Sequence, residues 1–213
     1  MRTLGIVTTP PGHRADLVLE TALGRPLLTY TAQAVLSSYR LSRAVLCTQT
    51  ARVADAAEEL GFELQAATAE EADLPGLVGM LEADEPHPYD AVMLLPAIHP
   101  LRTRDDIDGA IALLQRTGAS TVATFTQRRG ASRLARIDAE GRVIDETDQP
   151  QRTFLRDGSI TCGRRALLAE NGTLMGPDCR AWLLPPERSC AVEDDFDRFL
   201  LEQLLRYPGR PAA

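Results

Sequence analysis

The chain contains no lysine, so all 23 of its basic residues are arginine. A phosphate loop of the Walker type needs a lysine as its point charge, and this sequence cannot form one. Phosphate chemistry in this protein would therefore have to use arginine, backbone amides or a metal ion. Arg14 is a candidate, because it ends the short loop 9–14 and a guanidinium can donate two parallel hydrogen bonds to a phosphate.

An acidic run near the C-terminus, Glu193-Asp194-Asp195, could supply carboxylates to Mg²⁺, which prefers hard oxygen ligands. The same run could instead be the acidic first turn of the last helix, where the helix dipole favours negative charge. Both interpretations stay open at this point. His99 could carry a proton, since histidine titrates near neutrality, although a lone histidine beside Pro100 is more often packed structurally.

Composition excludes several classes of function. The 213 residues, 44% hydrophobic and 25% charged, are typical of one globular domain. The formal charge of −7, without basic runs, argues against general binding to nucleic acid. No apolar stretch approaches the roughly 20 residues of a membrane helix, and the start of the chain does not resemble a signal peptide, so we expect a cytoplasmic protein without a membrane partner. The scattered Cys47, Cys162, Cys179 and Cys190 indicate neither a zinc site nor a disulfide framework.

Apolar runs typical of strands alternate with amphipathic segments typical of helices. We expect residues 9–14 to form a loop, because Pro10 and Pro11 lack amide hydrogens and oppose a helix start there. The alternation predicts βαβ units and a mostly parallel sheet with helices on both faces. The predicted strands are 3–8, 44–48, 62–66, 90–95, 120–125 and 159–162, and the predicted helices are 26–37, 51–60, 74–81, 104–116, 164–170 and 196–206.

In a parallel sheet of this kind, ligands bind beyond the carboxyl ends of the strands. Four loops follow predicted strands or lie near them: 8–16, 48–50, 96–103 and 156–162. We therefore expect these loops to form the site.

Several segments together resemble the acylneuraminate cytidylyltransferase family, which makes CMP-sialic acids and related CMP-sugars. Each match is weak alone, but their order and spacing cover nearly the whole chain. The matching segments are GRPLLTY (24–30, family GKPLIAY), VLCTQ (45–49, a family strand ending in Ser-Thr-Asp), LLPAIHPLRT (94–103, family LLQPTSPLRT), FLRDGSI (154–160, family dGxIY) and PPERS (185–189, family PPERS).

The resemblance implies a three-layer α/β sandwich of the nucleotidyltransferase-like (Rossmann-like) type, with a mainly parallel mixed sheet. It implies one domain over residues 1–207, in which the polar segment 127–158 forms a small arm that leans over a partner subunit's site in a homodimer. We expect the tail 208–213 to be disordered.

For function, the resemblance implies transfer of CMP from CTP to a sugar acid or a similar acidic small molecule, with release of pyrophosphate and with Mg²⁺ as cofactor. It also implies the roles of individual residues. These are Arg14, His13, Arg102 and Arg156 in catalysis; Thr8, Gly12, Gln49, His99 and Asp157 in nucleotide or substrate binding; and Glu193, Asp194 and Asp195 at the metal.

The sequence departs from the family where the chemistry should occur. The family's first loop reads roughly A-R-G-G-S-K-G, but here both glycines are replaced by Pro10 and Pro11, and His13 stands at the lysine position. The family's metal motif D-x-D falls on Ala191 and Glu193. An alternative interpretation is therefore a catalytically impaired homologue that acts as a binding or partner subunit, or an enzyme re-specialised for another nucleotide or acceptor.

Overall fold

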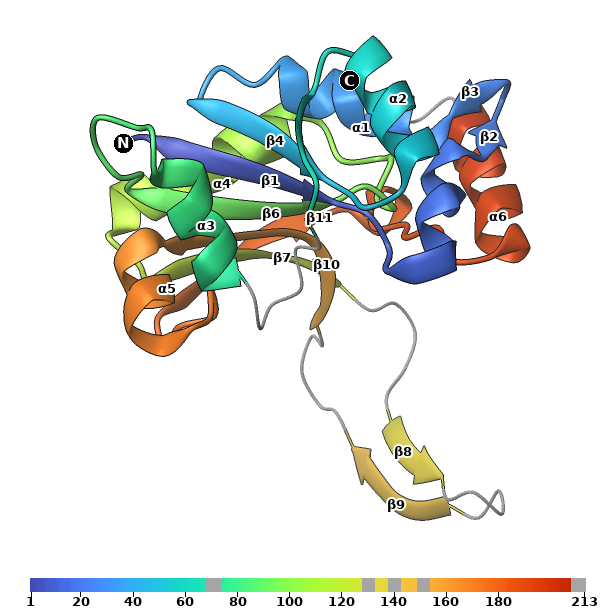
Figure 1. Cartoon of the computed structure of the whole chain (residues 1–213). Coiled ribbons are helices and arrows are strands. Elements are labelled where there is room, and N and C mark those ends of the chain that lie inside the picture. Colours follow the sequence, from blue (N-terminus) through green and yellow to red (C-terminus); the bar gives the residue numbers. More distant parts are fainter. Residues whose placement is uncertain (68–73, 128–132, 138–142, 149–153, 208–213) are drawn as a thin grey trace.

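The computed structural model describes residues 1–67, 74–127, 133–137, 143–148 and 154–207, apart from the side chains of His13 and of 133–148. Within this part of the chain, seven strands form one sheet in the order β11-β7-β10-β6-β1-β4-β5 (Figure 1). β10 is antiparallel to both of its neighbours, and the remaining pairs are parallel, so the sheet is mixed but mainly parallel as predicted. The strands are β1 (Thr3–Thr8), β4 (Arg43–Cys47), β5 (Glu63–Gln65), β6 (Ala91–Pro96), β7 (Thr121–Gln127), β10 (Phe154–Arg164) and β11 (Cys179–Leu184).

Helices cover both faces of this sheet. β1 alternates its side chains between them: Val7 packs into the core under α1, α2 and α4, while Leu4 and Ile6 pack into the core under α3 and α5. The two cores confirm the expected three-layer α/β sandwich. The helices are α1 (Leu27–Leu36), α2 (Ala51–Glu59), α3 (Leu74–Glu82), α4 (Arg104–Thr117), α5 (Arg165–Asn171) and α6 (Asp195–Arg206), with the 3₁₀ segments η1 (Gly12–Leu19) and η2 (Pro186–Arg188).

The sequence-based elements agree with the structure except at η1, at η2, at β11 and in one short hairpin. The expected loop 9–14 was wrong in its second half, because η1 begins at Gly12, directly after Pro11. The two prolines lie directly before the 3₁₀ helix and do not interrupt it, and proline is well tolerated at the start of a helix. β11, η2 and the short hairpin of β2 (Thr21–Ala22) and β3 (Arg25–Pro26) were not predicted from the sequence.

The arm predicted over 127–158 begins where β7 and β10 end, because Gln127 pairs with Phe154. Its described part is an antiparallel pair, β8 (Arg133–Ile137) and β9 (Val143–Asp148), drawn apart from the main sheet in Figure 1. The rest of the arm and the tail 208–213 lie outside the described residues. The homodimer stays a prediction.

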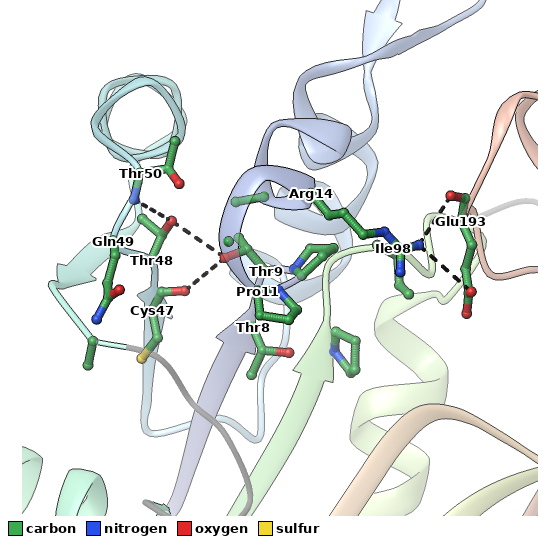
Figure 2. A pocket seen from close by; sticks show the side chains of 15 residues that line it. Thr8, Thr9, Pro11, Arg14, Cys47, Thr48, Gln49, Thr50, Ile98 and Glu193 are labelled. Carbon is green, nitrogen blue, oxygen red and sulfur yellow. Dashed lines mark hydrogen bonds and ion pairs between the residues drawn. The ribbon is translucent and has the colours of Figure 1, made fainter.

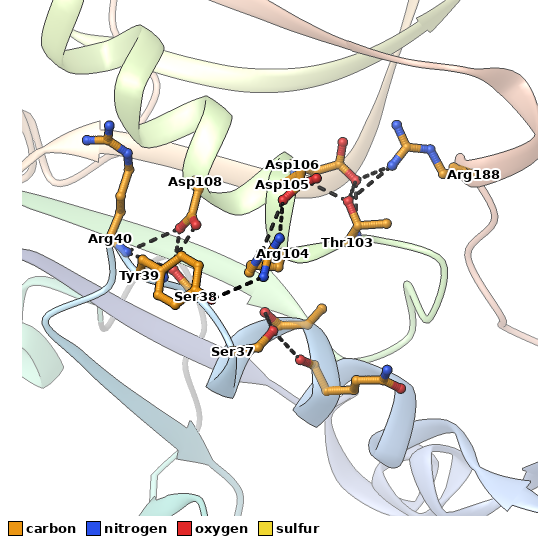
Figure 3. A network of polar contacts seen from close by, with 12 residues as sticks. Ser37, Ser38, Tyr39, Arg40, Thr103, Arg104, Asp105, Asp106, Asp108 and Arg188 are labelled. Atoms are coloured by element: carbon orange, nitrogen blue, oxygen red, sulfur yellow. Dashed lines mark hydrogen bonds and ion pairs between the residues drawn. The ribbon is translucent and has the colours of Figure 1, made fainter. Parts of the chain in front are cut away.

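A buried carboxylate fixes the loop that precedes α4. Thr103 caps α4, and its hydroxyl and amide both bond to Asp106 in a reciprocal capping box. The Asp106 carboxylate also accepts a hydrogen bond from Arg188 at 2.6 Å (Figure 3). It accepts another from the Trp182 indole at 3.2 Å. One buried group thus joins α4, β11 and η2, so the backbone around Arg102 is held from several sides.

No helix in the described part of the chain is long and apolar enough to cross a membrane.

Candidate functional site

A cavity of about 350 Å³ lies at the carboxyl ends of β1, β4 and β6 (Figure 2). Parallel pairing brings these ends together, since Thr8 is in register with both Cys47 and Pro96. Three of the four expected loops line the cavity, and Glu193 closes it from the segment before α6. The lining residues are Thr8, Thr9, Pro10, Pro11, Gly12, Arg14, Ala15, Cys47, Thr48, Gln49, Thr50, Ala67, Pro96, Ile98 and Glu193.

One wall of the cavity is polar but uncharged. The Thr9 hydroxyl lies 3.4 Å from both the Cys47 carbonyl oxygen and the Thr48 hydroxyl, and Thr48 Oγ1 accepts a hydrogen bond from the Thr50 amide at 3.2 Å. The Gln49 side chain adds an amide with two donors and an acceptor. Thr8 and Gln49 were predicted from the sequence as binding residues, but Thr9, Thr48 and Thr50 were not. Their position directly after apolar runs was the signal that could have identified them.

The two charged residues among the lining residues interact with each other. The Arg14 guanidinium donates to the main-chain oxygen of Glu193 at 3.2 Å and lies 3.8 Å from its carboxylate. Figure 2 shows the Arg14 side chain extending toward Glu193. The formal charge of the lining is therefore zero, and an anionic ligand must compete with Glu193 for Arg14.

The loop after β1 offers few backbone donors to such a ligand. Pro10 and Pro11 carry no amide hydrogen, and both line the cavity. Gly12 follows with φ of +61° and opens η1, which also carries His13. The His13 side chain lies outside the described residues.

The acidic run before α6 contributes one carboxylate to the cavity. Glu193 is that group; Asp194 accepts a hydrogen bond from the Asp197 amide as the cap of α6, and Asp195 pairs with Arg198 at 2.9 Å. The described residues contain no group of three or more His, Cys, Asp or Glu that could hold a metal. This donor set does not fit a Mg²⁺ ion held by the protein alone; such an ion would need ligand phosphates as well.

A second polar group lies behind the cavity, in the loops after β6 and within β10. His99 is 5% exposed and Arg102 is 3% exposed. Arg102 donates to the carbonyl oxygens of Ser159 at 2.6 Å and Pro96 at 3.3 Å. Buried polar atoms without a hydrogen-bond partner remain on four neighbouring residues: His99 Nδ1, Arg102 Nε and Nη2, Asp157 Oδ2 and Ser159 Oγ.

Burial sets the protonation of this group. It lowers the pKa of His99 to about 4, an effect that the Arg102 charge strengthens and Asp157 opposes. Burial also lowers the pKa of Arg102 to about 10, against the opposing effects of Asp106 and Asp157. At neutral pH, His99 is uncharged and Arg102 remains a cation.

The structure thus divides the predicted site residues between two places. Thr8, Gly12, Arg14, Gln49 and Glu193 meet at the cavity. His99, Arg102 and Asp157 form the buried group, which touches the cavity wall at Pro96. Arg156 is exposed beside this buried group and donates a hydrogen bond to the Thr161 hydroxyl at 2.9 Å. The pairing of β10 with β7 is irregular between these two residues, that is, over residues 157–160.

No family model and no curated protein matches this sequence. Solved structures do match its fold. CMP:2-keto-3-deoxy-manno-octonic acid synthetase, in complex with CTP, superimposes with a TM-score of 0.71 at 13% identity, covering 97% of this chain and 99% of that one. A 4-diphosphocytidyl-2C-methyl-D-erythritol synthase from Anaerococcus prevotii DSM 20548 gives 0.70 at 13% identity, covering 97% of each chain. A further synthase of the same name gives 0.70, covering 96% and 99%.

These comparisons establish a cytidylyltransferase-like fold over nearly the whole chain. At this level of identity they concern the fold alone. The particular resemblance to the acylneuraminate family remains an expectation from the sequence.

Proposed function

We propose that this protein binds a nucleotide by its nucleoside end in the cavity of Figure 2, with cytidine nucleotides as the expected ligands, and that it transfers CMP from CTP slowly or not at all. The location supports this proposal, because the cavity lies at the edge of the sheet where α/β folds bind ligands. The fold supports cytidine, since structures of similar fold include an enzyme solved with CTP.

The observation that carries the proposal is the Arg14–Glu193 pair. A triphosphate brings several negative charges, and the lining offers one arginine already paired with a carboxylate. Charge-assisted hydrogen bonds contribute about 1.5–3 kcal/mol each, so a described lining whose one arginine is already paired, and which lacks the amides of residues 10 and 11, binds phosphates weakly. The cavity therefore favours the part of a nucleotide that carries no charge.

The remaining lining suits a nucleoside. Small-molecule sites are mostly apolar with a few well-placed polar groups, and their volumes begin near 300 Å³. The threonine hydroxyls and Gln49 can each donate and accept hydrogen bonds, as base and ribose require. Pro10, Pro11 and Ile98 provide apolar surface in the same cavity.

The second candidate function is CMP transfer from CTP to a sugar acid or similar acid. In this reaction the acceptor oxygen forms a bond to the α-phosphorus, and the bond to pyrophosphate breaks. The buried group favours this candidate, because Arg102 is a cation with unpartnered donors next to the cavity wall and could hold an acidic acceptor.

One experiment separates the two candidates. The native protein is incubated with each of the four nucleoside triphosphates and a panel of sugar acids, with Mg²⁺, with Mn²⁺ and with neither. Pyrophosphate release and nucleotide–acid conjugates are measured, and binding is measured in parallel. The proposal expects cytidine nucleotides to bind without pyrophosphate release. Catalytic turnover with CTP would establish the second candidate, and absence of any nucleotide binding would contradict both.

A further inference from the structure

The loop between β6 and α4 contributes to two cavities. Pro96 and Ile98 line the cavity of Figure 2, whereas the second half of the loop lines another cavity of about 240 Å³ between α1 and the start of α4. The residues that line this second cavity are Tyr30, Gln33, Ala34, Ser37, Pro100, Arg102, Thr103 and Arg104. The two cavities share no lining residue, so they are separate sites.

The described lining of the second cavity is cationic. Arg102 and Arg104 are its two charged residues, and no aspartate or glutamate stands among the lining residues. The acids of the first turn of α4 are engaged elsewhere: Asp106 binds Arg188 at 2.6 Å, and the exposed Asp105 pairs with its neighbour Arg104 at 3.0 Å. An exposed pair of this kind is weak, so it offsets only part of the Arg104 charge. The cavity therefore favours an anion.

The Arg102 guanidinium has an unused pair of donors. Its Nη1 donates to the carbonyl oxygens of Ser159 and Pro96, while Nε and Nη2 have no hydrogen-bond partner. Nε and Nη2 lie on the same edge of the planar guanidinium, and two parallel N–H groups on one edge match the two oxygens of a carboxylate or a phosphate. Asp106 and Asp157 act on Arg102 through their charges, but neither forms an ion pair with it. Arg102 is only 3% exposed, so this edge lacks the water that would otherwise satisfy it.

We propose that the second cavity binds a small organic anion by a carboxylate or phosphate group, which Arg102 holds through Nε and Nη2. The start of α4 adds to this preference, because Thr103 and Arg104 line the cavity and the N-terminus of a helix favours negative charge. Figure 3 shows Arg104 at this end of α4 and Ser37 at the end of α1, which line the cavity from two sides.

Two further features define the ligand. The hydroxyls of Tyr30 and Ser37 and the Gln33 amide line the cavity and offer hydrogen bonds to the rest of a small polar molecule. Nε and Nη2 are enclosed in the free protein, so the anion reaches them through a side-chain shift of the kind that commonly accompanies binding. Because this cavity is separate from that of Figure 2, the anion is a ligand in addition to the nucleotide and not the acceptor of CMP.

Binding of simple anions to the native protein tests the proposal. Acetate, pyruvate and inorganic phosphate are titrated at low salt, each beside an uncharged analogue: acetamide, pyruvamide and trimethyl phosphate. Calorimetry and ligand-observed NMR measure the affinities. We expect at least one anion to bind with a Kd in the millimolar range or below and its analogue to bind at least tenfold more weakly. Anions that bind no better than their analogues would overturn the proposal.

Three variants test the location. Gln33→Glu adds a negative charge at the cavity and is expected to weaken the anion at least fivefold, whereas the matched control Gln115→Glu, at an exposed position near the other end of α4, is expected to leave it unchanged. Arg102→Lys keeps the charge but loses the paired donors, and is expected to weaken binding at least tenfold. Circular dichroism checks the fold, since Arg102 also holds two carbonyl groups.

A competition experiment separates this site from the nucleotide cavity. Saturating cytidine is expected to leave anion binding unchanged. Equal effects of Gln33→Glu and Gln115→Glu, or displacement of the anion by cytidine, would overturn the assignment to the second cavity. Neither outcome depends on whether the protein transfers CMP.

Discussion

Arg14 and Glu193, which are 179 residues apart in the chain, close one side of the cavity by binding each other. From the sequence, one was expected to bind phosphate and the other a metal ion. In the free protein, each side chain therefore interacts with the other instead of with a ligand. A nucleotide that binds either residue must first separate the pair. The free energy needed for this weakens the binding of the phosphates and leaves the binding of the nucleoside unchanged.

Glu193→Gln is expected to strengthen the binding of CMP without metal. The substitution removes the carboxylate charge beside Arg14 and leaves its hydrogen bond to the main-chain oxygen of residue 193. Since an exposed ion pair contributes up to about 1 kcal/mol, the gain is about fivefold at low salt. Cytidine, which has no phosphate, is expected to bind as before. Calorimetry with both ligands measures the difference, which shrinks in 1 M salt because the charges are screened.

Glu20→Gln is the matched control, since Glu20 is a similarly exposed acid near the same face and pairs with Arg198. It is expected to leave CMP binding unchanged. An equal effect of Glu193→Gln on cytidine and CMP would mean that Glu193 acts on the nucleoside and not through Arg14.

Restoring the phosphate loop and the metal carboxylates is expected to recover CTP binding. The variant carries Pro10→Gly, Pro11→Gly, His13→Lys, Ala191→Asp and Glu193→Asp. Two regained charge-assisted hydrogen bonds at about 1.5–3 kcal/mol each correspond to a gain of two or more orders of magnitude in affinity. Titration with CTP and Mg²⁺ measures it. A variant that folds and binds CTP no better than the native protein would contradict this explanation of the weak site.

The Pro10→Ala/Pro11→Ala variant separates two contributions of glycine. Alanine restores the amide hydrogens but cannot adopt the positive φ that a phosphate cradle uses. We expect it to recover part of the gain in CTP affinity that a Pro10→Gly/Pro11→Gly variant gives, as measured by the same titration.

Protonation of His99 is expected to destabilise the protein in acid. Its pKa is about 4 in the folded state, against 6.5 as the ordinary value, so the unfolded chain binds the additional proton between these values. The free energy of unfolding then falls as the pH decreases from about 6.5 to about 4, by roughly 3 kcal/mol from this residue, and is level above pH 7. Denaturant titrations across this range measure the effect.

His99→Asn should remove this part of the pH dependence, whatever it does to stability at pH 7. His87→Asn is the matched control, because His87 is exposed, and it should keep the native pH dependence. Equal slopes for all three proteins between pH 4 and 6.5 would show that His99 is not the residue responsible.

The arm is expected to join two subunits. Leu183 and Phe154 are exposed on β11 and β10, near the point where the arm leaves the sheet, and they offer apolar surface to a partner. Replacing residues 128–153 by an Asn-Gly turn between the paired Gln127 and Phe154 should halve the molar mass of the protein in solution. Light scattering that shows a monomer for the native chain at micromolar concentration would contradict this interface.

The sequence predicted those elements whose residues form strong local patterns. The apolar run before Pro96 identified β6, and the acidic residues after Thr103 identified the start of α4. β11 was missed because it lies at the sheet edge, where Arg180, Ala181 and Leu183 are all exposed and the pattern of a buried strand is absent. η1 was misjudged because a proline pair is as compatible with the residues before a helix as with a loop.

The candidate site was predicted as a set of loops but not as a set of contacts. The carboxyl ends of parallel strands meet by topology, so the loops after β1, β4 and β6 could be chosen in advance. Packing between segments far apart in the chain decides whether Arg14 faces a ligand or Glu193. It also decides whether His99 lines the cavity or lies behind Pro96. No local pattern encodes those contacts.

In the proposed function, the nucleoside and not the phosphates accounts for binding at this cavity. The most direct measurement is calorimetry of the native protein with cytidine, CMP and CTP, each with and without Mg²⁺. We predict that CTP binds in the millimolar range, within about tenfold of cytidine, and that Mg²⁺ makes no difference. Tight CTP binding that depends on Mg²⁺ and exceeds cytidine binding by a hundredfold or more would contradict the claim and establish a working triphosphate site.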